Sequence, residues 1–116
     1  MNILVKVKPL SINDATKGRH FPTKAKTQFC NTMRLILPNE RVVGLPYYRV
    51  RYDFHLVRFA TTDWDNLVKI TQDCLVERGI ITDDRLIIEA HVRKFKARED
   101  SMMIEIVGIA GHGEAE

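Results

Sequence analysis

The sequence predicts an α/β (α+β) protein, in which helices pack on one face of a mixed β-sheet to give two layers. Stretches of apolar–polar alternation, typical of strands with one buried face, take turns with stretches whose apolar residues recur every three or four positions, typical of amphipathic helices. The expected order is β-α-β-α-β-β. Each helix has one apolar stripe, which the face of a sheet can bury. The length of 116 residues allows one compact domain with a core.

We expect a single domain over residues 1–110 and a flexible tail over residues 111–116, because the tail consists of small and polar residues. No apolar run approaches the ~20 residues that a transmembrane helix needs, and residues 1–8 lack the shape of a signal peptide. We therefore expect a cytoplasmic protein that does not associate with membranes. Cys30 and Cys74 lack metal-ligand spacing, and we interpret them as small apolar residues rather than a disulfide.

The first half of the chain predicts a strand, a loop and a helix. Residues 2–8 alternate, with Ile3, Val5 and Val7 on one face. Residues 9–24 are rich in turn formers and have no period, which indicates a loop. A helix is expected over residues 24–37, capped by Thr23 and ended by Pro38. Its apolar stripe consists of Ala25, Phe29, Met33 and Ile36.

Three further strands are expected. Residues 47–59 give the clearest alternation, and residues 86–95 and 102–109 alternate as well. Because the last two lie close together in the sequence, we predict that they pair as a hairpin. The first of the three buries one set of side chains and exposes the other. The buried set is Tyr48, Val50, Tyr52, Phe54 and Leu56, and the exposed set is Arg49, Arg51, Asp53 and His55.

The stretch from residue 63 to residue 84 predicts the second helix. Thr62 or Asp63 is suited to cap its start, and Gly79 follows its last turn, where a left-handed residue often ends a helix. The apolar stripe is Leu67, Ile70, Thr71, Cys74 and Leu75.

The same stretch is an acidic island in a basic chain. It holds six acidic and two basic residues, a net charge of −4, whereas the whole chain carries +3, so the other residues carry +7. A basic surface attracts polyanions such as nucleic acid. Phosphate repels clustered carboxylates unless a divalent cation bridges the two. This combination is what a metal-dependent nuclease requires.

Each part of the pattern also has an ordinary structural explanation. Asp65, Lys69 and Asp73 are spaced four residues apart, as in surface ion pairs on one helix face. Asp63 is suited to a helix cap, and Asp83-Asp84 to a turn. Together these ordinary explanations must account for five aspartates around one helix. A metal-dependent nuclease therefore stays open as the competing hypothesis.

The pattern D-x-D-N-L-x-K-x-x-x-D-x-L-x-x-x-G-x-x-x-D-D resembles the signature of the RusA family of Holliday-junction resolvases. The match has no gap, and ten positions in one register make it specific. The matching residues are Asp63, Asp65, Asn66, Leu67, Lys69, Asp73, Leu75, Gly79, Asp83 and Asp84.

The resemblance implies a magnesium-dependent endodeoxyribonuclease that resolves four-way DNA junctions as a homodimer in recombination and repair. It also implies that three aspartates hold Mg²⁺, with Mn²⁺ as a substitute. Hard carboxylate oxygens are the ligands that magnesium prefers. The implied metal ligands are Asp63, Asp65 and Asp84. The implied catalytic set adds Lys69 to these three, with Asp73 and Asp83 in support.

The resemblance extends to the loop after the first strand, where Pro9, Ser11 and Asn13 match a P-x-S-x-N motif. We expect this loop and the basic end of residues 86–95 to contact the DNA backbone. The sequence departs from the family just before D-x-D, where a run of arginines is common and Arg58 stands alone. The expected DNA-binding residues are Asn13, Lys17, Arg19, Lys24, Arg93, Lys94 and Lys96.

Three other functions compete with this interpretation. An EF-hand calcium loop is excluded because Leu67 takes a ligand position and Cys74 stands where glutamate is needed. A phospho-acceptor receiver domain would need a repeated βα alternation that this chain lacks. A catalytically inactive branched-DNA-binding accessory protein of phage or prophage origin stays as the alternative, although the three metal-ligand positions are intact.

Overall fold

The computed structural model describes residues 1–17, 21–43 and 45–114. The strands are β1 (Asn2–Val5), β2 (Thr16–Lys17), β3 (Phe21–Pro22), β4 (Tyr47–Leu56), β5 (Ile87–Lys96) and β6 (Ser101–Ile109). The helices are α1 (Ile12–Ala15), α2 (Lys24–Ile36) and α3 (Asp65–Glu77), with short 3₁₀ turns η1 (Phe59–Thr61) and η2 (Asp84–Leu86). The long elements follow the predicted order, and α1, β2 and β3 are short additions within the predicted first loop. No helix among the described residues is both long and apolar enough to cross a membrane.

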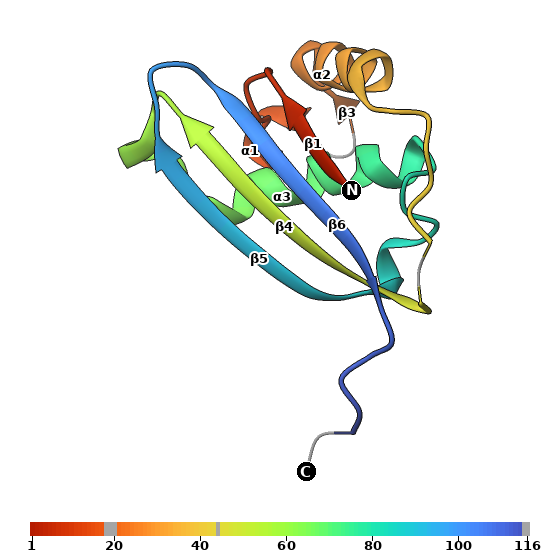
Figure 1. Ribbon diagram of the computed structural model, residues 1–116. Helices are drawn as coiled ribbons and strands as arrows, with labels where there is room; N and C mark the ends of the chain where they lie inside the picture. The colour runs from red at the N-terminus through yellow and green to blue at the C-terminus, as the bar shows by residue number, and fades with distance from the viewer. Residues whose placement is uncertain (18–20, 44, 115–116) are drawn as a thin grey trace.

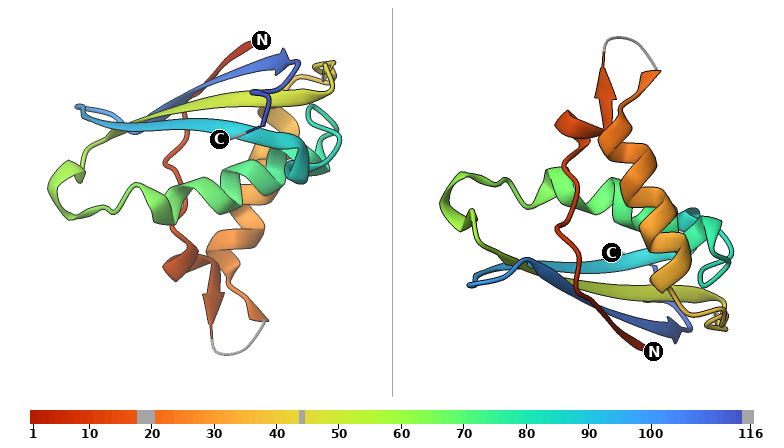
Figure 2. Two further views of the ribbon diagram at one scale, coloured as in Figure 1. Left: turned by 90° about the horizontal axis from the view of Figure 1, so that it is seen from below. Right: turned by 90° about the horizontal axis from the view of Figure 1, so that it is seen from above.

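The predicted two-layer architecture is confirmed. Four strands form a mixed sheet in the order β1-β6-β4-β5, in which β4 and β5 run parallel and the other neighbours antiparallel. Figures 1 and 2 show that α1, α2 and α3 all lie on one face of this sheet. Helix α3 is the crossover between the parallel strands β4 and β5, as parallel pairing requires.

The predicted hairpin of the last two strands is wrong, because β4 lies between them. β4 pairs with β5 on one side and with β6 on the other. Burial explains the difference: β6 buries Met102, Ile104 and Ile106, whereas no residue of β5 is fully buried. The more apolar strand therefore takes the inner position, and the charged strand β5 takes the edge.

The core lies between the sheet and the helices. The five predicted apolar positions of β4 and all five stripe residues of α3 are buried, as predicted. The predicted exposed face of β4 is wrong at Asp53, which is buried, because Arg93 of the neighbouring strand hydrogen-bonds its carboxylate. In α2, Phe29 and Met33 are buried as predicted, but Ala25 and Ile36 are exposed. The helix ends at Ile36, and the extended backbone that follows turns Leu37 into the core instead.

The helix ends are confirmed in part. Thr23 caps α2 by accepting a hydrogen bond from the Lys26 backbone, and Gly79 follows α3 with a left-handed φ of 83°. The predicted side-chain cap of α3 is wrong. Trp64 occupies the cap position without a side-chain hydrogen bond, and the Thr62 hydroxyl donates to the Arg58 carbonyl instead.

Candidate active site

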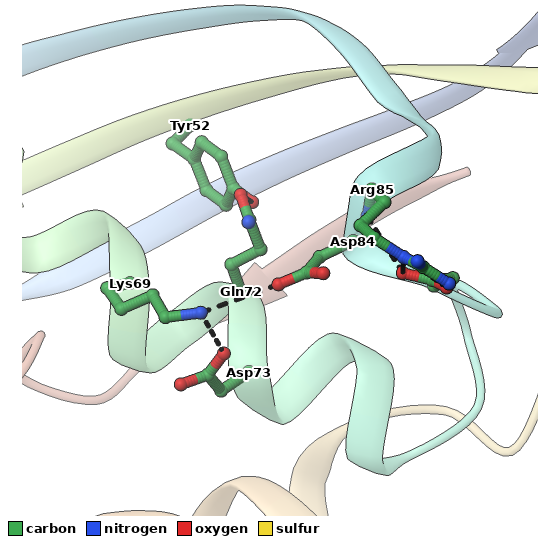
Figure 3. A network of polar contacts seen from close by, with 7 residues as sticks. Tyr52, Lys69, Gln72, Asp73, Asp84 and Arg85 are labelled. Atoms are coloured by element: carbon green, nitrogen blue, oxygen red, sulfur yellow. Dashed lines mark hydrogen bonds and ion pairs between the residues drawn. The ribbon is translucent and has the colours of Figure 1, made fainter.

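Three charged side chains gather where α3 passes the start of β5. Lys69 and Asp73 lie one turn apart on α3, and the Lys69 Nζ atom is 2.9 Å from Asp73 Oδ1. Asp84 enters from η2, and its Oδ2 atom lies 3.4 Å from the same Nζ. Figure 3 shows the ammonium group reaching both carboxylates, so one cation joins acids from two separate segments.

Lys69 keeps its positive charge in this cluster. Its hydrogen bond to Asp73 is the largest cause that raises the pKa of Lys69, and the contact with Asp84 raises it further. The side chains of Lys69 and Asp73 are about half exposed, so water screens both ion pairs and they add little to stability. The cluster is therefore better suited to meeting a ligand than to holding the fold together.

A buried tyrosine anchors α3 beneath the cluster. The Tyr52 hydroxyl of β4 donates a hydrogen bond of 3.1 Å to the Oε1 atom of Gln72 on α3 (Figure 3). Burial is the main cause that raises the pKa of Tyr52, and the charges of Asp73 and Asp84 add to it. The phenol therefore stays neutral and fixes the helix turn from which Lys69 and Asp73 project.

Asp83 is committed to its own turn. Its carboxylate accepts a 2.9 Å hydrogen bond from the Arg85 backbone N–H and a 2.8 Å bond from the Arg85 guanidinium. These hydrogen bonds are the largest causes that hold the pKa of Asp83 below its usual range. The contacts shape η2, which carries Asp84, and this geometry is compatible with the supporting role expected of Asp83.

Asp63 and Asp65 lie at the other end of the site, around the start of α3, and both are exposed. Asp65 is one turn before Lys69, but the Lys69 ammonium pairs with Asp73 and Asp84 instead. Asp63 lines a pocket of about 290 Å³. Ser11, which follows β1, and Asn13 of α1 line the same pocket.

A comparison with protein-family models gives the decisive observation. The model described as endodeoxyribonuclease RusA matches residues 15–107, most of the chain and all of the acidic stretch. The chain belongs to the RusA endodeoxyribonuclease family. No curated protein matches it.

Nucleases of the RusA family generally depend on a divalent metal, and the chemistry of the predicted ligands fits one. Asp63, Asp65 and Asp84 offer carboxylate oxygens, which magnesium prefers. Among the residues that the structure describes, no group of three or more histidine, cysteine or acidic side chains is arranged to hold a metal ion. The convergence of these three aspartates therefore stays a prediction for this RusA-family chain.

The predicted DNA-binding residues have different surroundings. Lys24, Lys96 and Asn13 are exposed. Arg93 makes two hydrogen bonds of 2.8 Å to the Asp53 carboxylate on the uncovered face of the sheet. Arg19 and the side chain of Lys17 lie outside the described residues. Binding of DNA by this set stays a prediction.

Lys94 has an internal role that the sequence interpretation missed. Its ammonium donates to the carbonyls of Phe59, at 2.7 Å, and Thr62, at 3.0 Å, and lies 4.6 Å from the centre of the Phe59 ring. These contacts tie β5 to the turn just before Asp63. The alternation contained the signal, since Lys94 shares the parity of the apolar Val92 and pairs with Phe54 in the sheet.

Proposed function

We propose that this protein is a magnesium-dependent, structure-specific endodeoxyribonuclease that resolves four-way DNA junctions by paired phosphodiester hydrolysis in the cytoplasm. Membership of the RusA family supports the nuclease activity. The observation that carries the assignment further is the contact of Lys69 with both Asp73 and Asp84 on an exposed surface. A homodimer would present one such site to each of two opposed strands.

The residues would divide the chemistry as follows. Asp63, Asp65 and Asp84 would hold Mg²⁺, with Mn²⁺ as a substitute. When bound, the ion activates water as a nucleophile and offsets the negative charge that develops on the phosphate. The Lys69 ammonium would stabilise that charge in the transition state.

The surrounding contacts would prepare Lys69 and Asp84 for these roles. Asp73 holds the Lys69 ammonium on the exposed face of α3, and Tyr52 fixes the adjoining helix turn through Gln72. Asp84 is about one-third exposed, so its carboxylate remains open to a cation. Such preorganised charges contribute to catalysis because they need not reorganise during the reaction.

The test is incubation of a synthetic four-way junction with the protein, with and without magnesium. We expect symmetric cuts on two opposed strands only when the metal is present. Asp65→Asn should keep junction binding, measured by gel shift, and should lose cleavage. Binding without cleavage by the unaltered protein under every metal condition would instead support the inactive branched-DNA-binding protein. Full-rate cleavage by Asp65→Asn would remove Asp65 from the metal site.

A further inference from the structure

An open groove of about 540 Å³ lies along the turn η1, which joins the end of β4 to the start of α3. Figures 1 and 2 show this light green turn at one end of the molecule. Arg58 and Thr61 line both this groove and the pocket beside Asp63, so the two adjoin. We call it the η1 groove, and its lining residues are Val57, Arg58, Phe59, Ala60, Thr61 and Lys96.

The apolar side chains of the η1 groove are open to solvent. Val57 is 52% exposed, Ala60 is exposed and the Phe59 ring is partly exposed. Trp64, at the start of α3, is 48% exposed and continues the apolar surface along the chain. Apolar side chains that gather in the open often mark a binding surface.

Hydrogen bonds hold the backbone of the η1 groove in place. The Val57 N–H donates to the Asp100 carboxylate at 2.9 Å. On the other side, the Lys94 ammonium donates to the carbonyls of Phe59 and Thr62. An apolar surface that is already fixed loses little conformational entropy when a ligand binds to it.

The charge of the η1 groove suits an anion. Among the described residues that line it, Arg58 and Lys96 are charged, both are exposed, and none is acidic. The adjoining pocket differs, because it is lined by the carboxylates of Asp14, Asp63 and Asp100. Cations beside apolar surface are the combination with which proteins bind single-stranded nucleic acid, since bases contact the apolar groups and phosphates the cations.

We infer that the η1 groove binds unpaired nucleotides of the DNA strand at the branch point. Their bases would lie against Val57 and Phe59, and their phosphates against Arg58 and Lys96. The inference rests on the proposed function, because it takes branched DNA as the ligand. It concerns affinity for an opened strand whatever its bases, since contact with the face of a base is sequence-tolerant.

The test measures binding in EDTA, so that the result does not depend on cleavage. Three DNAs are titrated by fluorescence anisotropy: a fully paired four-way junction, the same junction with two unpaired thymidines at the branch point, and an oligothymidine strand. We expect the unpaired thymidines to tighten junction binding about tenfold, because the protein need not open base pairs itself.

Two valine variants that change the net charge equally provide the comparison. Val57→Asp places a carboxylate in the η1 groove and should abolish the preference for unpaired thymidines. Val43→Asp should retain it, because Val43 is also exposed but precedes the opposite end of β4. Thermal unfolding checks that both variants remain folded. If Val57→Asp unfolds, Ala60→Asp replaces it, at an exposed position of the same groove.

The outcomes separate this inference from the proposed function. A preference for unpaired thymidines without any cleavage in magnesium would support the groove and overturn only the nuclease. Equal affinity of the unaltered protein for the two junctions, or no binding to any of the DNAs, would overturn the groove. A uniform loss in Val57→Asp across all three DNAs would limit the groove to phosphate contacts and also overturn it. A molar mass that changes in Val57→Asp alone, measured by light scattering, would assign the groove to a contact between copies of the chain instead.

Trp64 provides a second readout at this end of the molecule, because it is the single tryptophan of the chain. We expect oligothymidine to quench its emission in the unaltered protein and in Val43→Asp, but not in Val57→Asp. Binding of oligothymidine without quenching would place the strand elsewhere on the protein and overturn the inference.

Discussion

Lys69 joins two separate acidic segments through ion pairs. It pairs with Asp73 on its own helix and reaches Asp84 across the gap to η2. Because these ion pairs are exposed, an ammonium at this position contributes little to folding. In the proposed mechanism, the ammonium charge is already oriented when a phosphate binds.

We predict that Lys69→Ala slows cleavage of bound junctions by about 10²–10³-fold, the cost of removing one preorganised transition-state contact. Junction affinity should change little, because many cations share the backbone charge. Single-turnover rates at saturating protein and gel-shift affinities measure the two effects.

Lys96→Ala provides the contrast, since Lys96 is an exposed lysine at the end of β5. It should weaken binding and reduce the salt dependence of affinity by roughly one unit, with the saturated rate preserved. If Lys69→Ala lowered affinity and rate by the same factor, Lys69 would be a structural or binding residue.

We propose that Lys94 supports the candidate site through the turn that precedes Asp63. Replacing it with methionine keeps the stem but leaves the Phe59 and Thr62 carbonyls without their charged donor. We expect Lys94→Met to cost about 1–3 kcal/mol of unfolding free energy. We also expect the saturated cleavage rate to fall about tenfold or more, because small displacements of a catalytic group are costly.

Arginine at this position tests whether Lys94 works through positioning. Lys94→Arg keeps hydrogen-bond donors on a long stem and should recover most of the cleavage rate. Urea unfolding and single-turnover cleavage give the two readouts. A loss of stability in Lys94→Met with an unchanged saturated rate would limit this lysine to holding the fold.

At the scale of elements, the end of α3 depends on one left-handed residue, Gly79. Gly79 has a φ of 83°, and a Cβ atom added there would meet nothing within 4 Å, so backbone strain is the only penalty. Gly79→Ala should therefore lower the unfolding free energy by about 1 kcal/mol. Gly113 provides a matched control, with a φ of 76° and equally open space, but it lies beyond the last strand.

Urea unfolding of the two alanine variants distinguishes an element boundary from a left-handed residue as such. Gly113→Ala should leave the transition midpoint unchanged, since no packed element depends on its backbone. An equal loss of unfolding free energy in both variants would mean that the position of Gly79 at the end of α3 adds nothing to the cost of a left-handed alanine. Gly79 sets the direction in which the chain leaves α3. This direction places the next two residues, Ile80 and Ile81, in the core, where both are buried.

The helices were more predictable than the sheet order for a physical reason. The stripe of α3 follows from the helical period alone, and every residue of that stripe is buried. Strand pairing depends on which strands share burial, and this is not a local property. Nearness in sequence favoured the pairing of β5 with β6. In the structure β6 pairs with β4 instead, because the apolar side chains of β6 are buried in the inner part of the sheet.

The candidate site likewise contains residues that the sequence indicated and residues that it did not. The four-residue spacing indicated an ion pair between Lys69 and Asp73, and the family resemblance singled out Lys69 and Asp84. The fold brings all three side chains into contact. Asp100 also lines the pocket beside Asp63, and nothing local in the sequence indicated it, because its partner is the Val57 backbone N–H, 43 residues away. Such residues can be found only when the chain path is known.

At the scale of the whole molecule, an ion pair spans the parallel junction of β4 and β5 on the face that the helices leave uncovered. Arg93 donates twice to Asp53, whose side chain is only 9% exposed, and Arg51 lies 3.7 Å from the same carboxylate. The hydrogen bond to Arg93 is the largest cause that holds the pKa of Asp53 below its usual 3.8. Edge strand β5 is thereby fastened to the centre of the sheet.

The sign of the resulting pH dependence follows from that lowered pKa. A carboxyl whose pKa is lower in the folded state stabilises the fold above its unfolded pKa, and the stability is lost as the pH falls through the folded pKa. Arg93→Met should therefore destabilise the fold at pH 7, and the difference from the unaltered protein should shrink below about pH 4. Urea unfolding at a series of pH values between 3 and 7 measures this difference.

The exposed pair of Arg34 and Glu77 shows what an ordinary surface contact would do, because both side chains are about half exposed. Arg34→Met should lower stability at pH 7 by less than Arg93→Met does, because water screens the exposed pair. A cost for Arg93→Met that stays constant down to pH 3 would mean that lost packing of the arginine stem, not the charge of Asp53, fastens β5. A pH-dependent cost would make this edge strand, which carries Lys94 toward the turn before Asp63, loosen in acid before the apolar core does.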